Sequence, residues 1–248
     1  EPCFVLFDVG HGQAALIRLG DGMDVLIDAG SHGRPRLARR VLLPALRELG
    51  VSRLKAIVCT HADADHWNAV PALMARLPVE RLVVDSDPAP ALLEAARRHG
   101  IPLETAREGI ILASTARGSL SVLATGPEPP ASSNDRSIAL RLRVGRWSVL
   151  LPADREEVGL RELSARGPGT CDLLIAPHHG RPCAGATEFG RVVRPKALLA
   201  SCGSRGTDYR SLAEYGAVEV HTTDRDGCLT VRFPEERDRG LEIEAFRR

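Results

Sequence analysis

Aromatic residues are scarce in this chain. They make up 4% of its 248 residues, whereas all hydrophobic residues together make up 44%. The core must therefore be built from Leu, Val, Ile and Ala. The sequence also lacks an unbroken apolar run near the roughly 20 residues that a membrane-spanning helix needs. Its charged fraction of 26% and its apolar content are those of an ordinary globular protein.

Lysine is nearly absent, since Lys55 and Lys196 are the only two, and arginine supplies almost all of the positive charge. The formal net charge of +1 gives the chain no overall attraction for nucleic acid or for an acidic membrane surface. The six cysteines form no CxxC pair, which excludes a zinc ribbon and a thioredoxin-type motif. Most of them lie in apolar runs and are interpreted as buried free thiols.

Strand-like and helix-like segments alternate along the whole chain. In the first half we expect a strand at 3–9, a hairpin over Asp21-Gly22, and helices at 35–48, 67–77 and 88–99. In the second half we expect strands at 119–124, 137–144, 146–152, 172–177 and 196–202, with helices at 155–165, 185–193 and 208–215. Two similar mixed halves predict a layered α/β sandwich. The Pro- and Ser-rich segment 126–135 is interpreted as a loop within one domain spanning 1–248.

The most informative motif is the run from His61 to His66, His-Ala-Asp-Ala-Asp-His. It places four metal-capable side chains within six residues, directly after an apolar strand, with small alanines between them. Imidazole and carboxylate suit Zn, Mn and Fe. The alternative is a polar loop in which Asp65 caps the next helix. That alternative explains one residue and leaves the other three unexplained, so the spacing favours a metal site.

Two later segments fit the same site, because each follows an apolar strand. Asp154 comes after the strand at 146–152, and His178 and His179 follow the strand at 172–177. Asp154 can also cap a helix, and the histidine pair can also form a polar turn. Together with the first motif, however, the three segments predict one shared cluster of metal ligands.

The order of these motifs resembles that of the metallo-β-lactamase superfamily. In sequence they are LIDAG (26–30), HADADH (61–66), SND-x-S (133–137), Asp154 and PHHG (177–180). More closely, the chain is similar to the hydrolase domain of the ComEC competence proteins, which act in DNA uptake. The opening DVGHG (8–12) resembles that group's DVGQG, and TTDRDG (222–227) resembles its closing T-x-R-D-G. The resemblance implies a four-layer αββα sandwich and two divalent metal ions, either Mn or Zn, with Mg also acceptable.

The resemblance also assigns roles to individual residues. His61 and Asp63 match ligands of the first ion, Asp65 and His66 match ligands of the second, and Asp154 matches the carboxylate that bridges both ions. His178 is the first choice for the late histidine ligand, with His179 as the alternative. The metal ligands are therefore expected to be His61, Asp63, Asp65, His66, Asp154 and His178, and the catalytic residues Asp65, Asp154 and His179.

Further residues are expected beside the metal ligands. Asp28 matches a carboxylate that orients a ligand, and Asp8 either does similar work or shapes its turn. The residues expected to orient ligands or to contact the substrate are Asp8, Asp28, Ser132, Asn134 and Arg181. Most superfamily members have His where this chain has Asp63, and they supply one more His before the bridging carboxylate. One metal site is thus richer in oxygen, which shifts its preference from zinc toward manganese or magnesium.

The resemblance implies a DNA nuclease domain that degrades the strand not imported during DNA uptake. Its substrate would be single-stranded DNA, and it would be one part of a longer bacterial inner-membrane protein, on the outer face, beside that protein's channel portion. Arg36, Arg40 and Arg47 share one side of the predicted helix at 35–48, although a solvated helix face explains them better. Two alternatives remain, namely a free-standing hydrolase of a small phosphodiester, ester or lactone, and a non-catalytic metal-stabilised binding module.

Overall fold

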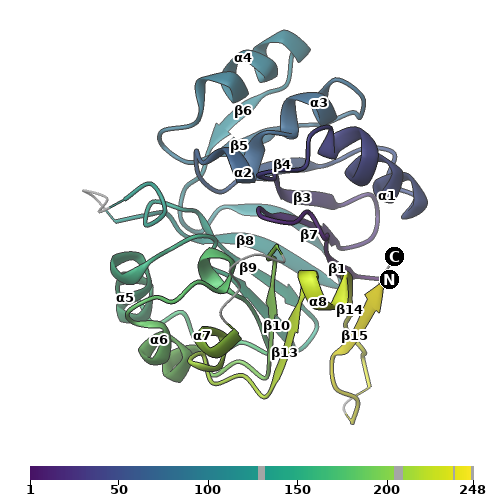
Figure 1. Ribbon diagram of the computed structural model, residues 1–248. Helices are drawn as coiled ribbons and strands as arrows, with labels where there is room; N and C mark the ends of the chain where they lie inside the picture. The colour runs from purple at the N-terminus through teal and green to yellow at the C-terminus, as the bar shows by residue number, and fades with distance from the viewer. Residues whose placement is uncertain (128–131, 204–208, 237, 247–248) are drawn as a thin grey trace.

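Two β-sheets packed face to face form the centre of the computed structural model, which describes residues 1–127, 132–203, 209–236 and 238–246 (Figure 1). The strands of the first sheet are β1 (Cys3–Leu6), β2 (Ala14–Arg18), β3 (Asp24–Ala29), β4 (Ala56–Cys59), β5 (Leu82–Val84), β6 (Leu103–Thr105), β14 (Cys228–Arg232) and β15 (Glu242–Phe246). Their order is β15-β14-β1-β2-β3-β4-β5-β6. The strands from β3 to β6 run parallel to one another.

The second sheet repeats this plan. Its strands are β7 (Ile111–Thr115), β8 (Gly118–Ala124), β9 (Ala139–Val144), β10 (Trp147–Leu151), β11 (Leu173–Ile175), β12 (Ala197–Ala200) and β13 (Glu219–Thr222), in the order β13-β12-β11-β10-β9-β8-β7. The strands from β10 to β13 are parallel. Each sheet therefore has a parallel half, and ligand sites form at the carboxyl ends of such strands.

Helices cover the outer face of each sheet. In Figure 1, α1 (Leu43–Glu48), α3 (Val70–Met74) and α4 (Pro90–His99) lie over the first sheet. Over the second sheet lie α5 (Glu157–Ala165), α6 (Ala186–Val193) and α7 (Tyr209–Ala213). One buried cluster fills the space between the sheets and two more fill the spaces beneath the helices. The predicted four-layer αββα sandwich is confirmed.

Several local predictions differ from the structure. The run from His61 to His66 is not all loop, because α2 (Ala64–Trp67) begins inside it. The predicted helix at 67–77 starts only at Val70, where Pro71 favours the first turn. The predicted helix at 35–48 opens with a π-helical turn at Ala38–Leu42. Strands β6, β7 and β15 were not predicted. All three lie at a sheet edge, and no residue of β6 or β15 is fully buried.

A membrane-spanning helix is not found in the described part of the chain: none of the helices there combines the necessary length with sufficient apolar content. All six cysteines are free, and four of them are buried, as expected from their apolar sequence context.

Arg155 anchors the loop that leaves β10. Its side chain is completely buried, an unusual place for arginine. The guanidinium donates to the Ser137 carbonyl at 3.1 Å and pairs with Glu162 of α5 at 2.8 Å. Nearby, the Asp135 carboxylate accepts hydrogen bonds from the backbone N–H groups of Glu156 and Gly159. These contacts hold the segment just after β10 against the loop that precedes β9.

We expect the substitution Arg155→Leu to lower the free energy of unfolding by about 3 kcal/mol, because it removes a buried ion pair and leaves its acceptors without donors. The exposed Arg161→Leu on α5 is the matched control and should change stability by less than about 0.5 kcal/mol. Urea unfolding followed by circular dichroism measures both. Equal stability of the two variants would contradict this account of Arg155.

Candidate metal centre

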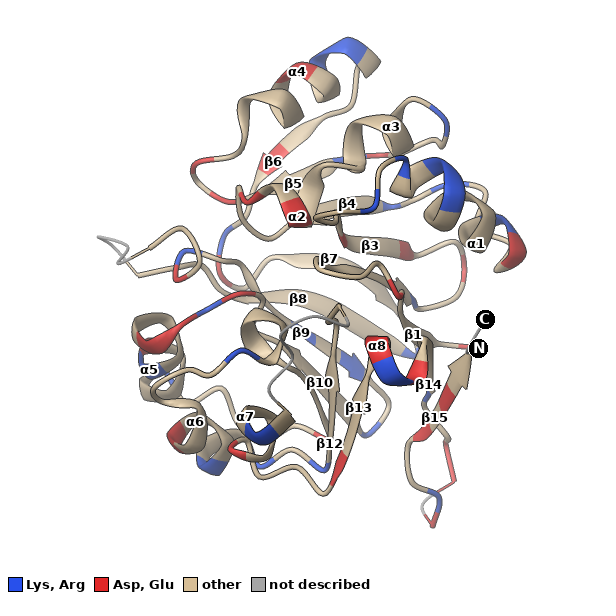
Figure 2. Cartoon of the chain, viewed as in Figure 1, with Lys and Arg blue, Asp and Glu red and all other residues tan. Residues whose placement is uncertain are grey.

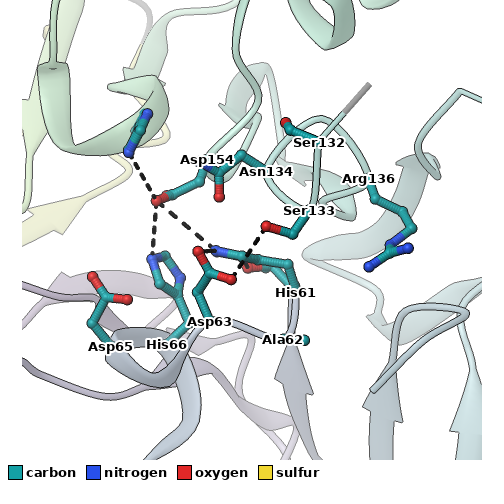
Figure 3. A network of polar contacts seen from close by, with 12 residues as sticks. His61, Ala62, Asp63, Asp65, His66, Ser132, Ser133, Asn134, Arg136 and Asp154 are labelled. Atoms are coloured by element: carbon teal, nitrogen blue, oxygen red, sulfur yellow. Dashed lines mark hydrogen bonds and ion pairs between the residues drawn. The ribbon is translucent and has the colours of Figure 1, made fainter. Parts of the chain in front are cut away.

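Three loops from the carboxyl ends of parallel strands meet at one edge of the sandwich. The loop after β4 carries His61 to His66, the loop after β10 carries Asp154, and the turn after β11 carries His178 and His179. Figure 3 shows the side chains of the first two loops pointing toward one another. Six of the chain's eight histidines gather here: His11, His32, His61, His66, His178 and His179.

The tautomers of two of these histidines follow from their hydrogen bonds. His66 Nδ1 lies 2.8 Å from the Asp28 carboxylate, and His179 Nδ1 lies 2.9 Å from the Ser201 carbonyl oxygen. Both partners only accept hydrogen bonds, so each Nδ1 carries the proton and each Nε2 of the neutral ring presents a lone pair. The two Nε2 atoms face each other at 3.2 Å, and both lie 3.2–3.3 Å from Asp154 Oδ2.

The tautomer of His61 is fixed by its hydrogen bond to Thr60. The Thr60 hydroxyl donates its single proton to Asp28 at 2.9 Å, so it accepts from His61 Nδ1 at 3.1 Å. His61 Nε2 thus also presents a lone pair, 4.0 Å from Asp154 Oδ2. Both this nitrogen and Asp154 Oδ1 are buried without a hydrogen-bond partner among the described residues. Lone pairs and carboxylate oxygens that converge without donors fit a divalent cation.

The ligand atoms form two adjoining groups, each within 4.8 Å. The first group is His61, His66 and Asp154, and the second is Asp65, His66 and His179. Asp63 stands beside the first group, with its Oδ2 3.9 Å from His61 Nε2 and nearly half of its side chain exposed. Two groups that share His66 match the expectation of two neighbouring ions.

The carboxylates of this cluster strengthen the hold of its imidazoles on protons. Burial lowers the pKa of His179, but the neighbouring Asp154 carboxylate outweighs burial and raises that pKa to about 9. Burial also lowers the pKa of His66, but the Asp154 and Asp28 carboxylates outweigh burial and raise that pKa well above its usual value. Burial raises the pKa of Asp154, yet His179 and His66 bring it well below its usual range. The cluster is therefore built to bind positive charge.

The geometry favours His179 over His178 as the late histidine ligand, the reverse of the first choice from the sequence. His179 is buried, with its Nε2 close to both Asp154 and His66. His178 Nε2 is 4.0 Å from Asp154, and its Nδ1 lies 3.1 Å from Glu156 at the partly exposed rim. Both residues have positive φ, 45° and 57°, which places the turn in the left-handed region.

The other expected residues are distributed around this cluster. Asp28 is completely buried and binds Gln13, Thr60 and His66, as expected of a residue that orients ligands. Asp8 instead pairs with Arg34 at 2.9 Å, accepts a hydrogen bond from the Gly10 N–H in its own turn, and belongs to neither ligand group.

The loop before β9 contacts the site mainly through Ser133, a residue that was not among the predicted site residues. Ser133 Oγ donates to Asp63 at 3.3 Å (Figure 3), whereas Ser132 and Asn134 bind Glu156. Arg181 follows the histidine turn and lines an open cleft together with Glu156 and His178.

Sequence reasoning missed His11 and His32. Their Nε2 atoms lie 3.6 and 3.4 Å from the Asp65 carboxylate. The available signal was the opening motif, in which His11 replaces the glutamine of the resembled group. Close approach of these segments depends on two glycines, because a Cβ on Gly12 or Gly30 would lie within 2.6 Å of the Asp65 carbonyl oxygen.

The sandwich with its ligand groups at the strand ends is the framework of a metal-dependent hydrolase fold. Residues 7–154 match the family model of the metallo-beta-lactamase superfamily, and the chain belongs to that superfamily. It is 30% identical over 253 residues to "ComE operon protein 3" of Bacillus subtilis and 24% identical over 237 residues to "Competence protein ComA" of Neisseria gonorrhoeae. Both matches cover 92% of this chain and 32% of the relative, so the chain spans about a third of their length.

A solved structure gives the same fold. The metallo-beta-lactamase fold protein YhfI from Bacillus subtilis matches with a TM-score of 0.61 at 15% identity, over 93% of this chain and all of that one. The resemblance to the superfamily and to its competence branch, inferred from the motifs, is confirmed.

We expect Asp28→Asn to weaken binding of Mn²⁺ by about 10- to 100-fold while the fold is kept, because Asp28 fixes the His66 ring and, through Thr60, the His61 ring. Asp8→Asn is the matched control, since it changes a carboxylate that pairs with Arg34 instead. Competition with a chromophoric chelator measures both affinities. Equal affinities would show that Asp28 does not orient the ligands.

Metal binding should also depend on pH. Below a pKa of about 9, His179 holds a proton that a cation must displace, so apparent Mn²⁺ affinity rises as pH increases from 7 to 9 and then levels off. Each displaced proton changes the affinity by about tenfold per pH unit in this range. Calorimetry at pH 7 in buffers of different ionisation enthalpy counts the protons released. A count of zero would contradict the raised pKa.

Proposed function

We propose that this domain hydrolyses phosphodiester bonds of single-stranded DNA, using two divalent cations, either Mn²⁺ or Zn²⁺, with Mg²⁺ also acceptable. The convergence of three imidazole lone pairs on Asp154 carries the metal-dependent part of the proposal. The competence relatives, matched over 92% of the chain, support DNA as the substrate.

The proposed ligands of the first ion are His61, Asp63 and Asp154, and those of the second are Asp65, His66, His179 and again Asp154. When bound, two such cations polarise a phosphodiester and lower the pKa of a nearby water.

The protein's own groups would position the substrate and move protons. Asp154 is buried, belongs to the first ligand group and lies 3.2–3.3 Å from His66 and His179 of the second, so its carboxylate can accept a proton from a water held between them. Arg181 lies at the rim, where its guanidinium can donate to phosphate oxygens, and His178 lies beside it with a lone pair on Nε2 of the neutral ring. Glu156 orients the His178 ring through its Nδ1 atom.

An arginine-lined cleft beside the metal centre supports a polyanionic substrate. Its lining residues include His32, Arg34, Arg36, Arg39, Asn68 and Arg76. Arg34 is neutralised by Asp8, whereas Arg36 and Arg39 are exposed and have no acidic partner within 4.0 Å in the described part of the chain. Figure 2 shows the basic residues gathered at α1 and the turn before it. Arginine forks suit phosphate groups, so a DNA backbone can lie along this cleft.

The cleft refines the earlier expectation for the 35–48 segment. Arg36 lines it, but Arg40 and Arg47 do not. These two belong to a solvated face of the helix, as the alternative interpretation of this segment predicts. A small phosphodiester, ester or lactone would not need the cleft, and for this reason DNA is preferred over a small substrate.

We further propose that the domain works within a longer protein. The chain spans about a third of its competence relatives, and the remaining portion would form the membrane channel that imports one strand. The domain would then face the outer side of the bacterial inner membrane and degrade the other strand.

The test is cleavage of an end-labelled single-stranded oligonucleotide with Mn²⁺, beside a small chromogenic phosphodiester. Asp154→Asn should lower kcat on both substrates by at least about a hundredfold, since it removes the carboxylate proposed to bind both ions. In the same assay, Arg36→Gln with Arg39→Gln should raise KM for the oligonucleotide by about tenfold. It should also reduce the slope of log affinity against log salt by about 1.4, as for two lost phosphate contacts on a single strand. Turnover of the small substrate should not change.

The matched control is Arg97→Gln with Arg98→Gln, two exposed arginines of α4 that pair with Glu94. This pair should leave both substrates unaffected. Turnover of a small ester but not of DNA would support a free-standing hydrolase instead. Bound metal without turnover of any substrate would support a binding module.

A further inference from the structure

We propose that His11, His32 and Asp65 bind a third divalent cation at the mouth of the metal centre. Their ligand atoms lie within 4.8 Å of one another. His11 and His32 are not among the ligands proposed above for the first two ions. Only Asp65 belongs both to those ligands and to the third site. The proposal thus goes beyond the proposed function.

The backbone holds the two imidazoles side by side. His11 lies in the turn after β1 and His32 in the turn after β3, and the His32 N–H donates to the His11 carbonyl at 2.6 Å. Ser31 reinforces this contact by donating its hydroxyl to the Val9 carbonyl and its N–H to Asn68. The rings are stacked, with centroids 5.5 Å apart and planes 26° apart. Both Nε2 atoms are thereby presented to Asp65.

The distances are those of ligands that share an ion. His32 Nε2 is 3.4 Å from Asp65 Oδ1, and His11 Nε2 is 3.6 Å from Asp65 Oδ2. A direct N–H···O hydrogen bond spans roughly 2.7–3.2 Å, so both contacts are too long. Two donors bound at about 2.1 Å to one tetrahedral ion lie roughly 3.4 Å apart. The observed separations therefore leave room for a cation between the imidazoles and the carboxylate.

Asp65 is placed like a second bridging carboxylate. Its Oδ2 faces His11 at 3.6 Å on one side and His179 at 3.7 Å on the other. Asp154 occupies the equivalent position between His61 and the pair formed by His66 and His179. The cluster is thus a row of three ligand groups, with Asp154 linking the first two and Asp65 linking the last two.

The chemistry of the third group selects its metal and its further ligands. The third group offers two imidazoles and one carboxylate, whereas the group of His61, Asp63 and Asp154 offers one imidazole and two carboxylates. The third group therefore suits Zn²⁺ better. The His32 side chain is 59% exposed and that of His11 is 37% exposed, so a coordination position stays open to water or to a phosphate oxygen. His32 also lines the arginine cleft, which places this position where a substrate phosphate would lie.

The experiment is a count of Zn²⁺ per chain by elemental analysis after equilibrium dialysis. We expect three ions in the unaltered chain and two in His11→Gln with His32→Gln. The control His99→Gln removes an exposed imidazole from α4, and this variant should keep three. The single variant His32→Gln changes an exposed side chain and so guards against misfolding. It should weaken binding of the third ion by at least about tenfold in a Zn²⁺ titration.

The outcomes separate this proposal from the function above. Two ions in both the unaltered chain and the double variant, with phosphodiester hydrolysis retained, would overturn the third site and leave the hydrolase intact. Three ions in the double variant would also overturn it, because the extra ion would then lie elsewhere. Fewer than two ions in the unaltered chain, with no hydrolysis, would overturn both proposals.

Discussion

The metal centre depends on one electrostatic conflict that the fold creates and only a positive charge relieves. Asp28 fixes the proton of His66 directly and that of His61 through Thr60, while the Ser201 carbonyl does the same for His179. Three nitrogen lone pairs then point at the Asp154 carboxylate in a buried space. Such an arrangement is costly unless protons or cations occupy it. Binding a cation and keeping the native geometry are therefore coupled.

The fold meets this cost with local constraints close to the site. Asp28, Ala153 and both histidines of the turn after β11 have positive φ, a conformation that non-glycine residues adopt only when their surroundings impose it. Gly12 and Gly30 let two turns approach the Asp65 backbone closely. Arg155 and Asp135 hold the loop that presents Asp154. These constraints fix the positions of the ligand atoms, as is typical of a preorganised site.

The oxygen-rich first group and the nitrogen-rich groups beyond it indicate different roles along one row. Asp63 is exposed and bound by Ser133, so the first group is open to hard cations and to exchange. The histidines in the middle of the row, His66 and His179, are buried. At the far end, the two stacked histidines lie next to the arginine cleft. Both ends of the row are thus more exposed than its middle, and one end adjoins the arginine cleft along which a long anionic substrate would bind.

The sequence by itself determined the fold class, the superfamily and the loops that form the site, because alternating apolar segments and the spacing of HADADH and PHHG are local patterns. Most core strands were found for the same reason, whereas the edge strands β6, β7 and β15 were missed, and β6 and β15 lack a buried periodicity. Only the tertiary structure distinguished His178 from His179, since it buries His179 with its Nε2 beside Asp154 and leaves His178 at the rim. It also brought His11 and His32 to Asp65 from turns about 30–50 residues away, a proximity set by strand pairing and glycine contacts that no local pattern encodes.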